Sequence, residues 1–285
     1  MKPIEALSLG WRSHLIFPRF DGLVTARDDC VLVRTPHNPT YWWGNFLLFD
    51  HAPREGDAKA WLAAFDAEIS TPQPESRHLA FGVDGPSTFA LPADFAALGF
   101  SALQECTLTL TPGQLRLPRK SLANGFRFGV ARLPAHAASA VDLQVESDMG
   151  GHEPIAYRVF HQRQMQRYGR MEAAGLGHWF GIFALTPQGE RLVADCGLFR
   201  DGFVRGALGR FQHVETHPGW RRLGLCSALI HAVCRHGFDA MGLASLVIVA
   251  DPADVAIVAY ESLGFRRCET LWQLERRPAA DQGAS

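Results

Sequence analysis

The sequence predicts an α/β (α+β) protein of two lobes, and three observations support this. Its 285 residues suffice for one large domain or two modest ones. Short apolar strand patterns alternate with helical periodicities along the chain. The segment Thr111–Asn124 carries two prolines, one glycine and several basic residues, and this composition is typical of a linker.

The two lobes share one order of elements. Three features recur at a constant separation of 165 residues: Leu98-Gly99-Phe100 and Leu263-Gly264-Phe265, Pro53 and Pro218, and the apolar runs 79–83 and 244–248. The prolines follow the apolar runs Phe46–Phe49 and Phe211–Thr216. Duplication of a strand, turn, helix, strand, helix, strand unit explains this spacing. The alternative is that common apolar sequence patterns recur at this separation by chance.

In the second lobe the pattern predicts each element in turn. We expect strands at Phe126–Ala131, Trp179–Leu185, Arg191–Phe199, Ala207–Thr216, Ser245–Ala250 and Glu269–Leu274, and helices at Tyr157–Met171, from Leu225 to His236 and at Ala253–Ser262. A Thr-Pro-Gln-Gly turn joins the second and third strands as a hairpin.

Composition excludes several classes of function. The formal net charge of −1 gives no general attraction for nucleic acid or an anionic membrane, and we expect neither as a partner. No apolar run approaches the roughly 18 residues that span a bilayer, and no secretory signal is evident. The six scattered cysteines resemble reduced thiols, so we expect a cytoplasmic protein.

The most informative segment is the run from Thr216 to Leu229. It reads as the end of a strand, a basic glycine-containing turn and the start of an amphipathic helix. Unpaired amides and the positive helix end would meet there, where an anion can bind. Arg221 and Arg222 suit phosphate oxygens, and Gly224 allows a close backbone approach. We expect this turn to bind a pyrophosphate; a solvated surface turn is the alternative.

This run and a later one resemble the GNAT superfamily of acetyl-CoA-dependent acyltransferases over about Phe126 to Pro278. The motifs are His217–Leu229 and Ala259–Phe265, a Tyr-x-x-Leu-Gly-Phe segment. The family's turn has Arg or Gln, two residues, Gly, one residue, then Gly or Ala. Cys226 fills the last position here, a small departure that requires its thiol to leave the phosphate approach open.

The resemblance implies two lobes that each hold a mixed, mostly antiparallel twisted sheet flanked by helices. It also implies acetyl-CoA as the cosubstrate, with its pantetheine beside the backbone of Val214 and Thr216. Tyr260 would lie near the thioester sulfur and protonate the departing thiolate. The turn's ligands would be Arg221, Arg222, Leu223, Gly224, Leu225, Cys226 and Ser227.

An amine nucleophile must lose a proton before it attacks. Glu215 and His213 alternate with Val214 on the strand and could act as the base, directly or through water. For both residues a polar side chain with only a structural role is the alternative. His231, Cys234 and His236 have metal-like spacing, but they do not share one helix face, and we expect no metal.

The first lobe lacks the same chemistry at the corresponding positions. Opposite Arg221, Gly224 and Cys226 it has Gly56, Lys59 and Trp61, and Phe95 stands opposite Tyr260. We therefore predict a degenerate GNAT-like lobe at residues 1–120 without a cofactor site, an acetyl-CoA-binding N-acetyltransferase domain at 125–278, and a disordered tail at 279–285.

The predicted activity is transfer of an acetyl group to a primary amine of a small molecule or peptide by direct attack. A non-catalytic acyl-CoA-binding or regulatory module, or an acyltransferase that uses a longer acyl-CoA, would fit the same turn. The sequence is also compatible with a homodimer.

Overall fold

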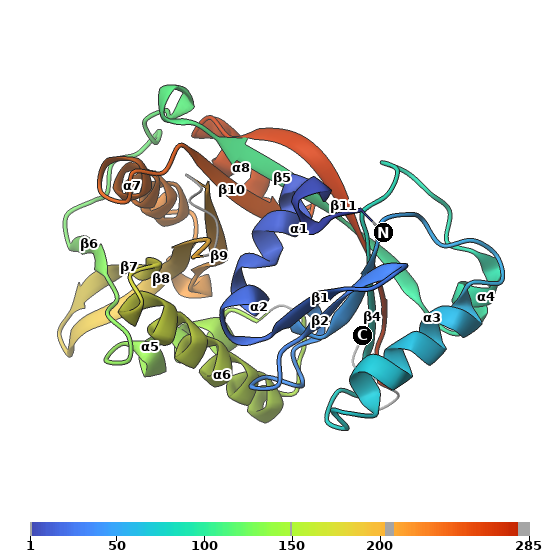
Figure 1. The fold of residues 1–285 in the computed structure, drawn as a ribbon. Helices are drawn as coiled ribbons and strands as arrows, with labels where there is room; N and C mark the ends of the chain where they lie inside the picture. The colour runs from blue at the N-terminus through green and yellow to red at the C-terminus, as the bar shows by residue number, and fades with distance from the viewer. Residues whose placement is uncertain (1, 149, 203–207, 279–285) are drawn as a thin grey trace. The chain divides into compact units, whose positions relative to one another are not determined.

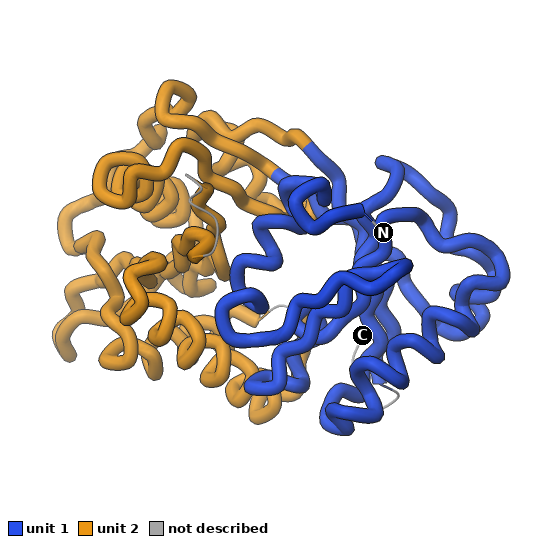
Figure 2. The backbone as a smooth tube through the Cα atoms, viewed as in Figure 1, with its two compact units in different colours: residues 1–107, 269–285 blue, residues 108–268 orange. Residues whose placement is uncertain are grey.

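The computed structural model describes residues 2–148, 150–202 and 208–278. Contacts divide the chain into two compact units (Figure 2). Unit 1 contains Met1–Thr107 and Glu269–Ser285, and unit 2 contains Leu108–Cys268. The predicted tail at 279–285 lies outside the described residues.

Unit 1 is a sheet flanked by short helices (Figure 1). Its strand order is β1-β2-β3-β4-β11, in which β3 and β4 are parallel and the other pairs are antiparallel. The elements are α1 (Leu9–His14), α2 (Ile16–Asp21), β1 (Leu23–Ala26), β2 (Cys30–Arg34), β3 (Phe46–Phe49), α3 (Ala58–Phe65), β4 (Leu79–Val83), α4 (Ala93–Ala97), β5 (Ser101–Leu110), which continues into unit 2, and β11 (Arg266–Arg276), which enters from unit 2.

Unit 2 repeats this plan with longer elements. Its order is β6-β7-β8-β9-β10-β5, with β9 and β10 parallel and β6 to β9 antiparallel. The elements are β6 (Phe126–Val130), α5 (Ala137–Glu146), α6 (Pro154–Ala173), β7 (Gly177–Thr186), β8 (Gly189–Arg200), β9 (Leu208–Thr216), α7 (Leu225–Asp239), β10 (Ser245–Ala250) and α8 (Ala256–Ser262). The predicted α/β class, with a mostly antiparallel sheet flanked by helices, is confirmed, although the strands form one 11-stranded sheet and not two.

The last strands of the two lobes are exchanged. In unit 1 the strand beside β4 is β11, with Trp272 opposite Val83. In the sheet β5, which follows α4 in sequence, lies beside β10, and its residues 101–107 belong to unit 1. Residues 269–276 of β11 also belong to unit 1, which is why unit 1 is discontinuous in sequence. The functional boundaries at 1–120 and 125–278 stay a prediction.

The internal repeat is visible in the structure. Strands β5 and β11 begin at Ser101 and Arg266, 165 residues apart. The glycines that end α4 and α8 have φ of +80° at Gly99 and +105° at Gly264, a left-handed conformation that favours glycine.

Two details differ from the sequence expectations. Helix α8 begins at Ala256, three residues later than predicted, because the Asp254 carboxylate accepts a hydrogen bond from the Ala256 amide at 2.8 Å and fixes a turn. The sequence analysis did not identify helix α5. Within the described residues, no helix has the length and apolar character needed to cross a membrane.

Candidate functional site

Strands β9 and β10 separate toward their carboxyl ends. Their ladder joins Ser245 to Leu208, Leu246 to Gly209 and Val247 to Arg210. Beyond these pairs β9 continues to Thr216 and β10 to Ala250. The facing edges of both strands therefore have backbone groups that can pair with an extended ligand lying between them.

A bulge in β9 reinforces this separation. Against β8, Glu215 pairs with Asp195 and Gln212 with Gly197, so two β9 residues lie opposite Cys196 alone. His213 has a φ of +43°, in the left-handed region. The bulge re-aims the backbone around the predicted cofactor contact Val214.

The turn at Arg221–Ser227, here called the basic turn, presents amides to one point. Arg222 and Gly224 have φ of +64° and +85°, and Gly224 is the N-cap of α7 without a side-chain capping bond. The first amides of a helix have no intrahelical acceptor, and alternating left-handed residues form an anion-binding nest. His213 and Arg222 are the non-glycine residues with positive φ among those described, and such strain collects at functional sites.

Basic side chains surround this turn. The Arg221 guanidinium donates from Nε to the Thr216 carbonyl at 3.0 Å, which ties the end of β9 to the turn. A Cβ built on Gly224 would lie 3.3 Å from Cβ and 3.6 Å from Cδ of Lys120. The exposed Lys120 thus runs across the start of α7, and the sequence analysis did not identify it as a site residue.

The predicted linker is packed onto unit 2 beside the basic turn. The Arg116 amide donates to the Leu263 carbonyl at 2.9 Å. A Cβ on Gly264 would collide with the carbonyl oxygen of Gln114, so this close packing also requires glycine. These contacts fix the segment that places Lys120 at the turn.

Glu215 has the protonation behaviour of a general base. Its pKa is raised to about 7, because burial outweighs the opposing effect of Arg221 and the carboxylates of Asp254 and Asp148 add to the increase. A carboxyl group that titrates near neutral pH can accept a proton at the working pH.

Behind Glu215 lies the fully buried Asp195, its partner across the β8–β9 ladder. The Asp195 carboxyl accepts hydrogen bonds from Trp179 Nε1 at 2.9 Å and Gln144 Nε2 at 3.0 Å. Burial raises its pKa well above the ordinary value, and Glu215 contributes. The two carboxyl groups therefore interact through a low-dielectric region.

Tyr260 on α8 is 3% exposed, and burial raises the pKa of its phenol well above the ordinary value. Cys226, Asp254 and Glu215 contribute to this increase, so the phenol lies within electrostatic range of all three. It stays protonated at neutral pH and can donate a proton. Burial likewise raises the pKa of Cys226 to about 12, which makes its thiol a poor nucleophile.

The other predicted residues take distinct places. Leu225 is buried in the core at 2% exposure, whereas Leu223 is 50% exposed, so only their backbones can serve a ligand. Ser227 lies in the first turn of α7. Burial lowers the pKa of His213 to about 4, so this histidine is neutral and, of the two candidate bases, is the weaker.

Sequence reasoning did not identify Asp148, Asp254 or Asp195 as site residues. The Asp148 carboxylate accepts from the amides of Gly150 and His152, both at 2.9 Å, and so orders the loop before α6. A signal existed for Asp195 alone: it is an acidic residue inside the apolar run Leu192–Phe199.

The corresponding place in unit 1 is closed. Trp61 stacks on Phe49 with centroids 3.6 Å apart. The Asp94 carboxylate accepts from the amides of Gly56 at 3.0 Å and Ala58 at 3.2 Å, at the start of α3. An internal carboxylate thus occupies the anion position of this lobe.

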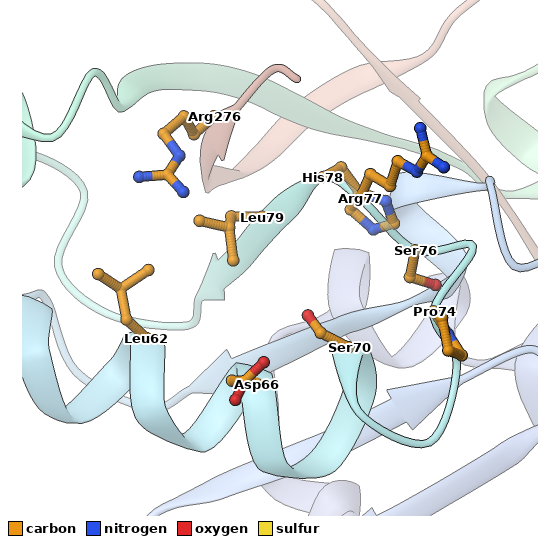
Figure 3. Close-up of a pocket in the computed structure, with 9 residues that line it drawn as sticks. All are labelled: Leu62, Asp66, Ser70, Pro74, Ser76, Arg77, His78, Leu79 and Arg276. Carbon is orange, nitrogen blue, oxygen red and sulfur yellow. The ribbon is translucent and has the colours of Figure 1, made fainter. Parts of the chain in front are cut away.

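Unit 1 has a hollow elsewhere, of about 490 Å³, which Figure 3 shows between the carboxyl end of α3 and the start of β4. Asp66 and Ser70 line it from the helix side, with His78 and Arg276 across from them. It lies at the end of α3 opposite to the position of the basic turn on α7.

Comparison with known proteins identifies a family for unit 2. Residues 144–265 match the model of the Acetyltransferase (GNAT) family. No curated protein sequence matches the chain significantly.

Solved structures match the fold of nearly the whole chain. A conserved protein of unknown function from Staphylococcus epidermidis has 14% identity and a TM-score of 0.67, over 90% of this chain and 94% of that one. A GCN5-related N-acetyltransferase from Kribbella flavida has 16% identity and a TM-score of 0.63, over 95% and 96%. A tandem GNAT protein of the clavulanic acid biosynthesis pathway has 15% identity and a TM-score of 0.50, over 80% and 72%.

Proposed function

We propose that this chain, whose residues 144–265 match the GNAT acetyltransferase family, transfers an acetyl group from acetyl-CoA to a primary amine. The observation that carries the proposal is the uncapped start of α7 beside the separated strands β9 and β10. The start of α7 suits a pyrophosphate, and the separated strands suit an extended chain with amide groups. CoA carries a pyrophosphate next to such a chain, its pantetheine.

In this proposal the basic turn binds the pyrophosphate through the amides of Arg222 to Ser227 and the cations of Arg222 and Lys120. The pantetheine pairs with the backbone of β9 at Val214 and Thr216. The thioester then lies between Glu215 and Tyr260, whose pKa values are raised by burial to different extents.

The reaction needs no covalent intermediate on the protein. Glu215 removes a proton from the ammonium of the acceptor, and the amine nitrogen forms a bond to the thioester carbonyl carbon. Backbone amides at the β9 bulge stabilise the charge that develops on the carbonyl oxygen. The carbon–sulfur bond then breaks, and Tyr260 gives its proton to the departing sulfur. The second proton of the amine nitrogen is released as the amide forms and restores the Tyr260 phenol, and Glu215 loses its own proton to solvent.

Specific features favour acetyl transfer over the alternatives. A non-catalytic CoA-binding module would have no need for a carboxyl group with a pKa near 7 beside a protonated phenol. The six cysteines are scattered along the sequence without a Cys-x-x-Cys pair, a pattern that favours a reducing compartment, and we propose the cytoplasm.

The test is calorimetry of acetyl-CoA binding, followed by a thiol-release assay with a panel of amines. We expect one equivalent to bind, and Arg222→Glu to weaken affinity at least tenfold through charge reversal at the turn. Arg235→Glu is the matched control, because Arg235 is an exposed α7 residue that pairs with Asp239 at 2.7 Å. Equal losses in both variants, or binding without thiol release for any acceptor, would contradict the proposal.

A further inference from the structure

Helix α6 has polar side chains among the residues of its buried face. Tyr157, His161, Gln164 and Tyr168 follow one another at intervals of three or four residues, the spacing of a single helix face. His161 and Gln164 are each 1% exposed. A histidine and a glutamine so deeply buried require hydrogen-bond partners.

Several of these polar atoms have no partner among the described residues. Both ring nitrogens of His161, Oε1 of Gln164 and Nε2 of His213 are buried without a hydrogen bond. The rings of His161 and His213 lie 5.4 Å apart, so the unmatched atoms of α6 and β9 lie close together. Leaving one such group unmatched has a free-energy cost, because the group loses its hydrogen bonds to water and gains none in the protein. Three residues that carry this cost in one place indicate a ligand that satisfies them.

Aromatic rings enclose the same atoms. The Tyr157 ring lies 4.3 Å from that of His161, and the Phe160 ring lies 4.6 Å from it. Phe160 also approaches the His213 ring at 6.4 Å. We call Tyr157, Phe160, His161, Gln164 and His213 the α6 cluster.

The α6 cluster adjoins the proposed base. His213 precedes Glu215 by two residues on β9. Burial raises the pKa of Tyr157, and the carboxylates of Asp148 and Glu215 add to this increase, so the phenol lies within electrostatic range of Glu215. A molecule that presents its amine to Glu215 can therefore extend its remaining groups toward the cluster.

The cluster is uncharged at neutral pH. Burial lowers the pKa of His161 and of His213, so both imidazoles are neutral. A neutral imidazole offers one donor and one acceptor, and Gln164 Oε1 offers an acceptor. Such groups match hydroxyls, which both donate and accept hydrogen bonds. Aromatic rings provide apolar faces for the carbon skeleton.

We propose that the α6 cluster binds the acceptor, and that this acceptor is a hydroxylated cyclic primary amine of the amino-sugar or aminocyclitol class. This inference rests on the proposed acetyl transfer. The reactive amine lies at Glu215, and the ring hydroxyls bind His161, Gln164 and His213.

The first experiment compares acceptors with the intact protein at saturating acetyl-CoA. The panel is glucosamine, 2-aminocyclohexanol, cyclohexylamine, cadaverine and lysine, with rates expressed per concentration of free amine. We expect kcat/KM to fall at least tenfold from glucosamine to cyclohexylamine, with 2-aminocyclohexanol between them. A preference for cyclohexylamine, cadaverine or lysine would overturn the inference.

The second experiment uses His161→Phe and Gln164→Leu. The matched control is Gln166→Leu, since Gln166 is an exposed residue of the same helix. We expect both cluster variants to raise the KM for glucosamine at least tenfold while kcat changes less than threefold. We also expect a higher Tm, because each replaces an unmatched buried polar group by an apolar one. The control should change neither.

The outcomes separate this inference from the proposed function. If the protein acetylates amines but the cluster variants leave the KM unchanged, the acceptor binds elsewhere and acetyl transfer stands. A lower Tm in both variants would show that these groups have a structural role, which also overturns the inference. If no amine in the panel or any wider set releases thiol, the proposed function fails first.

Discussion

The two lobes follow one plan, but one is open where the other is closed. In unit 1, β3 and β4 pair up to their last residues, Phe49 and Val83, and the Asp84 amide extends the ladder to the Phe49 carbonyl at 2.7 Å. In unit 2 the parallel ladder stops at Val247 with Arg210, well before β9 ends. The two lobes therefore differ in how far their parallel strand pair stays hydrogen-bonded, although the order of their strands is alike.

A short insertion accounts for the open strands. Leu48, opposite Gly82, precedes Pro53 by five residues, whereas Arg210, opposite Val247, precedes Pro218 by eight. Unit 2 thus has three more residues in this stretch, which holds the bulge and Glu215. The separation of 165 residues holds at the prolines and between Gly82 and Val247, but not between the partners of these two residues, Leu48 and Arg210.

The starts of α3 and α7 also differ, with a capping carboxylate at α3 and none at α7. In unit 1 the Asp94 carboxylate caps α3, whereas the position 165 residues later is Ala259, which has no group to cap α7. The comparison indicates that a lobe of this plan is stable with either an internal carboxylate or an external anion at this point. The following substitutions test this difference.

The largest effect should come from Glu215→Gln, which removes the base that the bulge carries. We expect kcat to fall about 10²–10⁴-fold, the usual contribution of general base catalysis. The rise of kcat/KM with pH around 7 should vanish as well, because Gln cannot titrate. A pH–rate profile of both proteins measures this, and an unchanged limb near pH 7 would exclude Glu215 as the base.

The same variant gives a check on stability. The pKa of Glu215 is raised from 4.5 to about 7 in the folded protein, so folding favours its protonated form. The free energy of unfolding therefore falls as pH rises from about 4.5 and levels off above about 7. Denaturant titrations should show Glu215→Gln gaining up to ~3 kcal/mol on the parent across this window. If the difference in free energy of unfolding between the variant and the parent did not change with pH, the raised pKa of Glu215 would be contradicted.

The second effect comes from giving unit 2 the internal anion of unit 1. Ala259→Asp should place a carboxylate at the start of α7, as Asp94 does at α3. It should weaken acetyl-CoA binding by about 100-fold, because it occupies the amides and repels phosphate. Ala259→Asn has nearly the same shape without charge and should weaken binding less than tenfold. Calorimetry measures these affinities. Equal affinities of the Asp variant and the parent would show that the basic turn does not bind the cofactor.

The third substitution makes the proposed proton donor resemble its unit 1 counterpart, Phe95. Tyr260→Phe should lower kcat about 10²-fold while calorimetric acetyl-CoA affinity stays within threefold, since only the hydroxyl is lost. Val258→Ala is the control, because Val258 is an exposed residue on the same helix at 68%. Parallel losses of affinity and rate would assign Tyr260 to binding instead.

The sequence predicted those elements of the fold that are identified by a short contiguous run of residues, and not those that depend on tertiary packing. Strand β10 was predicted to the residue at Ser245–Ala250, because a short run of β-branched and apolar residues identifies a buried strand. The exchange of β5 and β11 could not be predicted, since two strands with similar patterns fit either place and only tertiary packing decides.

The same limit applies to the candidate site. The basic turn could be predicted because its residues are contiguous, and the structure gives it the backbone such a turn needs. The bulge at His213 could not, since a histidine with positive φ is rare and is imposed by the surrounding sheet. Lys120 and Asp94 reach their helix starts from distant segments, which no local pattern reveals.

The smallest effect should come from opening the closed lobe. Asp94→Ala removes the cap of α3 and should lower the free energy of unfolding by about 1 kcal/mol. It should not create a second cofactor site, because Trp61 stacked on Phe49 still fills the space and β3 stays paired with β4. Calorimetry should therefore still give one equivalent of acetyl-CoA. Two equivalents would mean that the carboxylate alone closes unit 1, and that the strands are free to separate once it is removed.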